Sequence, residues 1–259
     1  MRFELSAALL SGYLLALARA TAWVFVAPPF GNKLVPKSVK VGLGAALALA
    51  MGPRMATHGA GAIGEAGFAT APFISAVVLQ LAAGAALGYL GVLLFGAVQA
   101  AGSLIDLFGG FTMAQLFDPM SNAGASVFGR LYSIMGVTIL FAIDGHLMII
   151  RGLIESVAAA PLTNLSLDAM RTTLTTGISH FLVAGAEIAA PLLAALVLSE
   201  IALGLLSRAA PQMNVLMLSM PAKALLCLTL GAAALPLVPD AVRALVREIV
   251  HGGRALSGP

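Results

Sequence analysis

Residues 66–105, AGFATAPFISAVVLQLAAGAALGYLGVLLFGAVQAAGSLI, decide the fold class, because these forty residues carry no charged side chain. Gln80 and Gln99 are the only amide side chains among them. A run of about 20 apolar residues is enough to cross a bilayer as a helix. The stretch therefore predicts an integral membrane protein.

The composition of the whole chain agrees with this prediction. Of the 259 residues, 60% are hydrophobic and only 10% are charged, whereas about 25% of the residues of a soluble domain are charged. The 14 basic side chains are too few and too scattered to form a nucleic-acid surface. The single cysteine, Cys227, excludes an internal disulfide and a cysteine-based zinc site.

Six apolar segments are expected to form helices, because Ala, Leu and Gly dominate them and no alternating pattern of a membrane β-barrel is present. The first is predicted to be a retained helix and not a cleaved signal peptide, since apolar sequence resumes directly after its small residues. The second segment is shorter, and the third longer, than a helix that just spans the bilayer. Such mismatched lengths suit helices that pack on other proteins. The segments cover residues 5–26, 39–51, 73–101, 127–150, 178–206 and 215–238.

The basic residues predict the orientation in the membrane. Lys33, Lys37 and Lys40 cluster between the first two segments, and basic loops favour the cytoplasmic side. Six crossings would then place the loop around Arg208 in the cytoplasm as well, and both termini outside. The basic tail after residue 240 argues for the opposite orientation.

Residues 102–119 combine an apolar composition with a Gly-Gly pair, two aspartates and a proline. Irregular backbone at membrane depth is tolerated only where protein or a watery cavity covers it. Large, soft side chains in this stretch suit the closing of a pore by exclusion, the glycines permit a turn, and the Asp-Pro pair restrains its end. An ordinary packing loop is the alternative interpretation. The candidate pore-closing residues are Gly109, Gly110, Phe111, Met113, Phe117, Asp118 and Pro119.

Ionisable side chains inside the apolar segments form a second group of candidates. Each would cost about 2.5–3.5 kcal/mol at a lipid-facing helix centre, so we expect them to face protein or water. Either a proton relay or structural ion pairs between helices would explain their presence. The residues are Arg19, Asp144, His146, Glu187, Glu200 and Lys223.

The loop at residues 206–214 predicts an antiparallel helical hairpin from the fifth and sixth segments, because its proline ends one helix or begins the next. Its arginine follows a helix C-terminus, where the helix dipole favours a cation, and this structural role is as well supported as a contact with a partner. The candidate contact residues are Lys37, Arg208, Pro211, Gln212 and Asn214.

Two further observations concern packing and chemistry. Gly84 and Gly88 form a pair of small residues four apart, which predicts a helix–helix contact. The chain has no Walker loop, dinucleotide fingerprint, His-Glu-x-x-His helix or Gly-x-Ser-x-Gly elbow. We therefore expect no enzymatic activity, no cofactor and no metal.

Four motifs, in order along the chain, resemble the FliR family, the R-type subunit of the flagellar type III export gate. They lie at residues 28–44, 109–119, 145–147 and 202–214, and their order and spacing match the family from end to end except in the C-terminal tail. The injectisome counterpart, SctT, shares the pattern, and the Pro-Gln-Met-Asn sequence at 211–214 favours the flagellar form. The chain departs from common members at Asp144, where Asn is frequent, and at Gln99, where a basic residue is frequent.

The resemblance implies a single-copy, all-helical subunit in the bacterial inner membrane, at the flagellar basal body. It would join several P-type and Q-type subunits (FliP and FliQ) in a channel for unfolded flagellar proteins, beside FlhB-type and FlhA-type gate proteins. The resemblance also implies a P-like part at residues 1–176 with a plug loop at about 106–119, a Q-like hairpin at 177–239 and a tail at 240–259.

A proton-coupled secondary transporter is the alternative. It would use the acidic and histidine side chains of the apolar segments, Asp144, His146, Glu187 and Glu200. Transporters of this kind usually contain an inverted repeat with the binding site at the midplane. The two halves of this sequence show no convincing repeat.

Overall fold

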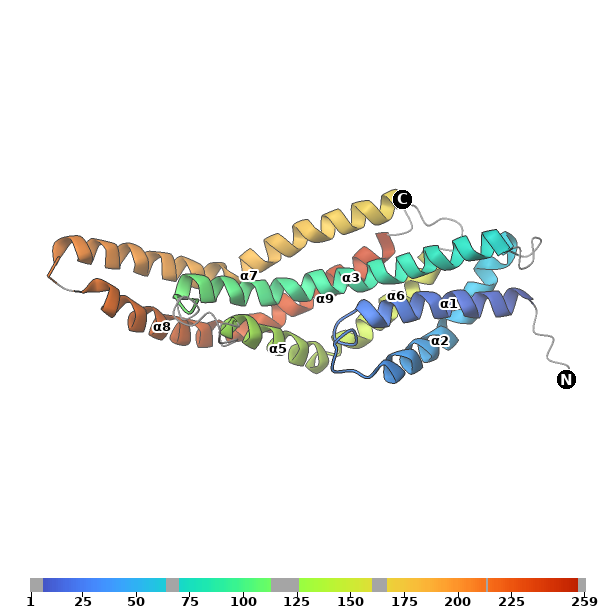
Figure 1. The fold of residues 1–259 in the computed structure, drawn as a ribbon, viewed down its shortest axis with the longest axis horizontal. Helices are drawn as coiled ribbons and strands as arrows, with labels where there is room; N and C mark the ends of the chain where they lie inside the picture. The colour runs from blue at the N-terminus through green and yellow to red at the C-terminus, as the bar shows by residue number, and fades with distance from the viewer. Residues whose placement is uncertain (1–6, 64–69, 113–125, 160–166, 213, 256–259) are drawn as a thin grey trace. The chain divides into compact units, whose positions relative to one another are not determined.

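A computed structural model describes residues 7–63, 70–112, 126–159, 167–212 and 214–255 of the chain (Figure 1). All regular elements within these ranges are helical, which confirms the predicted all-α fold. The helices are α1 (Ala7–Val26), α2 (Lys37–Ile63), α3 (Thr70–Gly109), α5 (Val127–Ala142), α6 (Gly145–Ala159), α7 (Leu167–Ala209), α8 (Val215–Ala234), the 3-10 helix η2 (Leu235–Leu237) and α9 (Val238–Ala255).

Four helical stretches are long and apolar enough to cross a membrane, so the chain is a multi-pass membrane protein. The pair α5 and α6 adds a fifth if its two helices form one broken span. The predicted segment 39–51 lies in α2, which is not among these stretches. The four stretches are Leu9–Val26, Ala71–Gly109, Met170–Ala209 and Met217–His251.

The chain divides into two compact units. Unit 1 comprises Met1–Leu94, Asp144–Ser179 and Leu245–Pro259, and unit 2 comprises Phe95–Ile143 and His180–Ala244. Helices α3, α7 and α9 each contribute to both units. The P-like and Q-like parts expected at 1–176 and 177–239 concern likeness to other subunits, and they remain a prediction.

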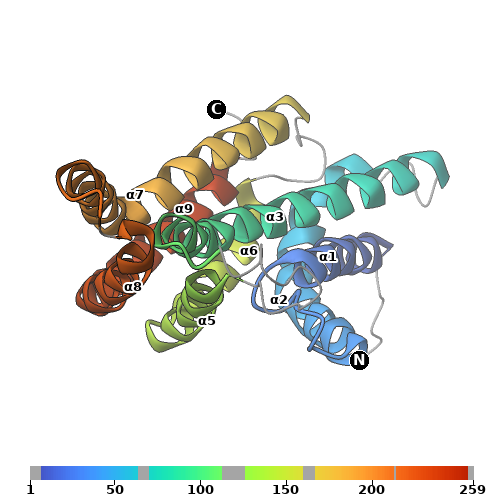
Figure 2. The same cartoon turned by 60° about the vertical axis from the view of Figure 1, so that its left-hand side comes forward.

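In unit 1, α2 runs back along α1, as both views show (Figures 1 and 2). A methyl group at Gly12 would lie 2.7 Å from the backbone nitrogen of Ala56, and one at Gly44 would lie 2.7 Å from the side chain of Thr21. The two backbones therefore approach closely along an antiparallel contact. This contact explains why α2 continues through Pro53 beyond the predicted apolar segment, because packing on α1 outweighs the local cost of proline.

The first half of α3 packs on α1 in the parallel direction through the predicted pair of glycines. A methyl group at Gly84 would collide with the carbonyl oxygen of Arg19, and one at Gly88 would lie 2.9 Å from Cβ of Val26. The helix–helix contact predicted from Gly84 and Gly88 is confirmed.

Unit 2 contains the last part of α3, α5, the part of α7 from His180, and α8. Its core includes the buried side chains of Val98, Ile105, Tyr132, Leu140 and Leu196. The chain returns from α7 into α8 as the predicted antiparallel hairpin (Figure 1).

Two of the predicted apolar segments are each interrupted by a break in the α-helix. The segment 127–150 is divided between α5 and α6 at Asp144, whose φ is 55°. The segment 215–238 ends as an α-helix at Ala234, because Pro236 lacks the N–H that a continuing helix needs. The predicted tail from residue 240 lies mostly in α9, up to Ala255.

Candidate functional site

The predicted pore-closing stretch begins at the C-terminus of α3, in unit 2. The Phe111 N–H donates to the carbonyl oxygen of Asp106 at 3.0 Å, and the Gly110 N–H donates to that of Leu107 at 3.4 Å. Gly110 has φ +82°, a conformation that glycine adopts without steric cost. These bonds form a Schellman motif that satisfies the last carbonyl groups of α3. A turn therefore lies at the Gly109-Gly110 pair, and the pore-closing role of these glycines stays a prediction.

The side chain of Phe111 is half-buried beneath this turn. Its ring centroid lies 5.5 Å from that of Phe128 on α5, with the ring planes at 59°. A methyl group at Gly109 would lie 2.7 Å from Sγ of Cys227 and 3.1 Å from the Phe111 ring, so α8 also lies close to the turn. The other predicted members, Met113, Phe117, Asp118 and Pro119, lie outside the described residues.

Asp106 is a central residue of this region: the resemblance placed it at the start of the plug loop, but it lies within α3, and the sequence analysis gave its side chain no role of its own. Its side chain is 1% exposed. Its carboxylate accepts a hydrogen bond from the Ser126 hydroxyl, one from the Phe128 N–H at 3.1 Å and one from the Gly129 N–H at 3.2 Å. A carboxylate is favoured here because the first N–H groups of a helix lack partners within it and carry partial positive charge.

Two serines complete this polar cluster. Ser126 is the N-cap of α5, and its Oγ accepts the Gly129 N–H at 2.9 Å. The Ser103 Oγ on α3 lies 3.1 Å from the Ser126 Oγ. The cluster joins the last turns of α3 to the first turn of α5. The sequence contains a signal for one member of the cluster, Ser126, because this serine directly precedes an apolar run and serine is a preferred N-cap.

Arg19, the first of the ionisable candidates, is fully buried in unit 1. Its guanidinium donates to Oε1 of Gln80 at 2.6 Å, and to the carbonyl oxygen and Oγ of Ser156 at 3.0 and 3.3 Å. Arg19 thus links α1, α3 and α6 and faces protein, as expected. These contacts give it a structural role.

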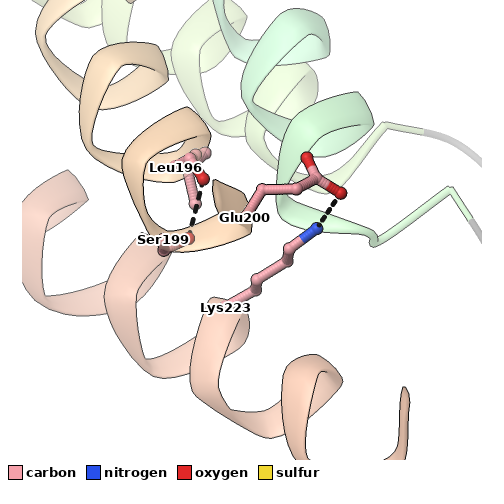
Figure 3. Close-up of polar contacts among 4 residues, drawn as sticks. All are labelled: Leu196, Ser199, Glu200 and Lys223. Carbon is pink, nitrogen blue, oxygen red and sulfur yellow. Dashed lines mark hydrogen bonds and ion pairs between the residues drawn. The ribbon is translucent and has the colours of Figure 1, made fainter. Parts of the chain in front are cut away.

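Lys223 and Glu200 form an ion pair of 2.9 Å across the α7–α8 hairpin (Figure 3). The Lys223 side chain is 15% exposed and that of Glu200 is 61% exposed. The Ser199 hydroxyl next to Glu200 donates to the carbonyl oxygen of Leu196 at 2.7 Å (Figure 3). The pair is an ion pair between helices, one of the two roles that the sequence analysis left open.

Three ionisable candidates remain, Glu187 in unit 2 and Asp144 and His146 in unit 1. Glu187 is exposed on α7 and lies thirteen positions before Glu200, which corresponds to about 20 Å along a helix, too far for direct proton transfer. Asp144 and His146 lie in unit 1 at the start of α6. Within the described ranges, no three His, Cys, Asp or Glu side chains gather as a metal site.

The candidate contact residues fall in two places. Arg208 lies exposed in the last turn of α7, and Pro211 and Gln212 form the exposed turn that follows. Asn214 caps α8, because its side-chain oxygen accepts the Met217 N–H at 3.3 Å. Lys37 is exposed at the first residue of α2, in unit 1. The contact role of these residues remains a prediction.

These features define an all-helical membrane protein whose described polar clusters hold helices together. Comparison with known proteins agrees with this class. Residues 10–249 match the family of bacterial export proteins, family 1, and the chain belongs to this family. The resemblance to the FliR family is confirmed. As a family member, the chain is a structural subunit of type III protein export that works with other components of the export apparatus, and it is not an enzyme.

Flagellar and injectisome proteins are both similar to the chain. It is 29% identical to the flagellar biosynthetic protein FliR of Escherichia coli (strain K12) over 245 residues, 92% of this chain and 90% of that protein. It is 26% identical to FliR of Bacillus subtilis (strain 168) over 219 residues, 83% and 82% of the two chains. It is 31% identical to the Yop proteins translocation protein T of Yersinia pestis over 147 residues, 56% of each chain. The proton-coupled transporter finds no support in these similarities.

Proposed function

We propose that this chain is the R-type subunit of the flagellar type III export gate in the bacterial inner membrane, at the basal body. There it contributes to the channel through which unfolded flagellar proteins leave the cytoplasm. The flagellar assignment depends on the share of each relative's length that aligns with this chain. The flagellar relatives align over 90% and 82% of their own lengths, whereas the Yersinia protein aligns over 56%.

Deletion of the gene in its own bacterium tests this assignment. We expect the deletion strain to lose secretion of flagellar proteins and swimming motility, and the wild-type chain supplied in trans to restore both. Where the cell also has an injectisome, secretion through it serves as the control and is expected to continue. Normal flagella in the deletion strain would contradict the proposal.

P-type and Q-type subunits are the proposed partners, with FlhB-type and FlhA-type proteins beside them. The exposure of Glu187 on a membrane-length helix supports a protein or water neighbour, since lipid is a costly environment for a carboxylate. The proposal retains a P-like part at 1–176, a Q-like hairpin at 177–239 and a tail at 240–259. The exposed turn at Arg208, Pro211, Gln212 and Asn214 is its proposed contact with a partner at one end of the hairpin.

Residues 109–119 are the proposed stopper of the channel at rest. A pore wide enough for an unfolded chain leaks ions unless something fills it, and a single-copy subunit can supply one asymmetric stopper. The Schellman turn at Gly110 and the contact of the Phe111 ring with Phe128 support this role at the start of the stretch. Met113 and Phe117 would add further large, soft side chains.

Replacing Phe111, Met113 and Phe117 together by glycine tests the stopper. We expect the gate to assemble and to pass small ions or dyes at rest, because the filling volume is removed. The matched control replaces the same three residues by alanine, and its leak should be smaller because less volume is lost. If the glycine variant assembles and stays as tight as the parent, the stretch is a packing loop.

A further inference from the structure

We propose that Asp106 is a positioning residue which, with Ser103 and Ser126, forms a latch between α3 and α5 and fixes the point where the chain leaves α3, before the pore-closing stretch, relative to the point where it enters α5. The latch comprises these three side chains. This inference rests on the proposed stopper role of residues 109–119 and assigns the residues that hold the stopper in place.

The carboxylate of Asp106 binds the start of α5 through both of its oxygens. Oδ1 accepts the Phe128 N–H at 3.1 Å, and Oδ2 accepts the Gly129 N–H at 3.2 Å together with the Ser126 hydroxyl. Hydrogen bonds to an ionised acceptor are roughly twice as strong as those between neutral groups. The buried site excludes competing water, which strengthens them further.

The same residue also binds, through its backbone, the turn where the chain leaves α3. The carbonyl oxygen of Asp106 accepts the Phe111 N–H, which closes the turn after α3. Phe111 then packs on Phe128, whose own N–H is bound by the Asp106 carboxylate. Asp106 therefore contacts the chain where it leaves α3 and where it enters α5.

Close packing of the two helices makes this geometry specific. A methyl group at Gly102, one turn before Asp106, would collide with the backbone of Phe128 and Gly129. The first turn of α5 thus lies directly on α3, with Ser103 within reach of Ser126. A carboxylate at residue 106 reaches the N–H groups of α5 only because Gly102 permits this approach.

Asp106→Asn in the assembled gate tests the latch, since asparagine has the same size but presents an NH₂ group to one of the N–H donors. We expect a resting ion leak about tenfold above the parent, as for the loss of one charge-assisted hydrogen bond. Asp240→Asn is the matched control, because it neutralises an exposed carboxylate of a surface pair in the same unit away from the stretch, and it should leave the leak unchanged.

A reversible disulfide separates positioning from general stability. Ser103→Cys with Ser126→Cys, in a Cys227→Ala background that removes the native thiol, places two sulfurs where the hydroxyl oxygens lie 3.1 Å apart. Copper phenanthroline should oxidise this pair rapidly at rest. In the Asp106→Asn gate, the oxidised cysteine pair should lower the ion leak to the parental level. Reduction of this disulfide in the same sample should raise the leak again.

Two results with the Asp106→Asn gate would contradict the latch. One is an assembled Asp106→Asn gate that stays tight while the triple-glycine stopper variant leaks. This outcome would contradict the latch but not the proposed function. The other is a leak that oxidation of the cysteine pair does not reduce. If Asp106→Asn fails to assemble, Ser103→Ala with Ser126→Ala decides, since an assembled and tight double variant would also contradict the proposal. A tight triple-glycine variant would instead contradict the stopper role itself.

Discussion

Asp144 shows how an ionisable residue in an apolar segment can act through its backbone. It is a non-glycine residue with positive φ, at 55°. Its carbonyl oxygen accepts the N–H groups of Leu147 and Met148 at 3.0 and 3.4 Å, so it begins α6. Aspartate and asparagine visit the left-handed region more readily than other residues with a Cβ. This preference explains why Asp can stand where Asn is frequent in the FliR family.

We predict that Asp144→Asn and Asp144→Gly retain export and that Asp144→Val impairs it. A β-branched residue in the left-handed region costs about 1–2 kcal/mol, which corresponds to a few degrees in the melting temperature. Thermal melting of the purified gate and an export assay measure the two effects. If the Asn and Gly variants both lose export at an unchanged melting temperature, the backbone role is contradicted and the carboxylate of Asp144 is needed for export itself.

At the scale of elements, the α7–α8 hairpin combines a predictable turn with an ion pair that spacing alone does not reveal. Proline at 211 is a local signal that acts as expected, and Asn214, expected only as a contact residue, is the N-cap of α8. The pairing of Lys223 with Glu200 depends on how the two helices face each other. A single sequence indicates which side chains share a face of each helix, but it does not indicate which residues of the two helices lie opposite each other.

Charge reversal tests the ion pair. Lys223→Glu places two carboxylates together at membrane depth, where an uncompensated charge costs about 2.5–3.5 kcal/mol. We expect this variant to lower the melting temperature and the yield of assembled gate, and the double variant Lys223→Glu/Glu200→Lys to recover most of the loss. Failure of the swap to recover any stability would mean that the pair does not join the hairpin.

Arg208 at the end of α7 supports a second prediction at this scale. A cation in the last turn of a helix contributes about 0.3–1 kcal/mol through the helix dipole. We expect Arg208→Glu to reduce assembly or export more than Arg208→Lys, which keeps the charge at this exposed position. Secretion and co-purification of the gate measure the difference, and equal, unimpaired export by both variants would refute the prediction.

Element boundaries were predictable only where a local signal sets them. Helix α2 continues through Pro53 because α1 covers it, and α3 extends to 40 residues because its halves pack in two different units. The latch of Asp106 was not predictable, since its partner Ser126 lies 20 positions away and is reached through helix packing. Tertiary contacts of this kind leave no periodic pattern in one sequence.

At the scale of the whole molecule, the all-α class and the family followed from composition and from motif order, which depend on no particular contact. The helices differ in how much of their surface the chain itself covers. It buries 50% of the apolar window of Ala71–Gly109 but 22% of the windows of Met170–Ala209 and Met217–His251. The hairpin helices therefore leave most of their surface to lipid or to other proteins.

The last prediction is that the chain alone aggregates or is degraded, and that co-expression with P-type and Q-type subunits rescues it. Lipid can cover the exposed leucines of α7, but the exposed carboxylate of Glu187 would cost about 2.5–3.5 kcal/mol at a lipid-facing centre. Size-exclusion chromatography and limited proteolysis compare the lone and co-expressed chains. Glu187→Gln is the matched variant: it should raise the monodisperse fraction of the lone chain, because it removes the charge that lipid would face, and should change the co-expressed complex little. A monodisperse, protease-resistant lone chain would mean that lipid alone satisfies the hairpin surface.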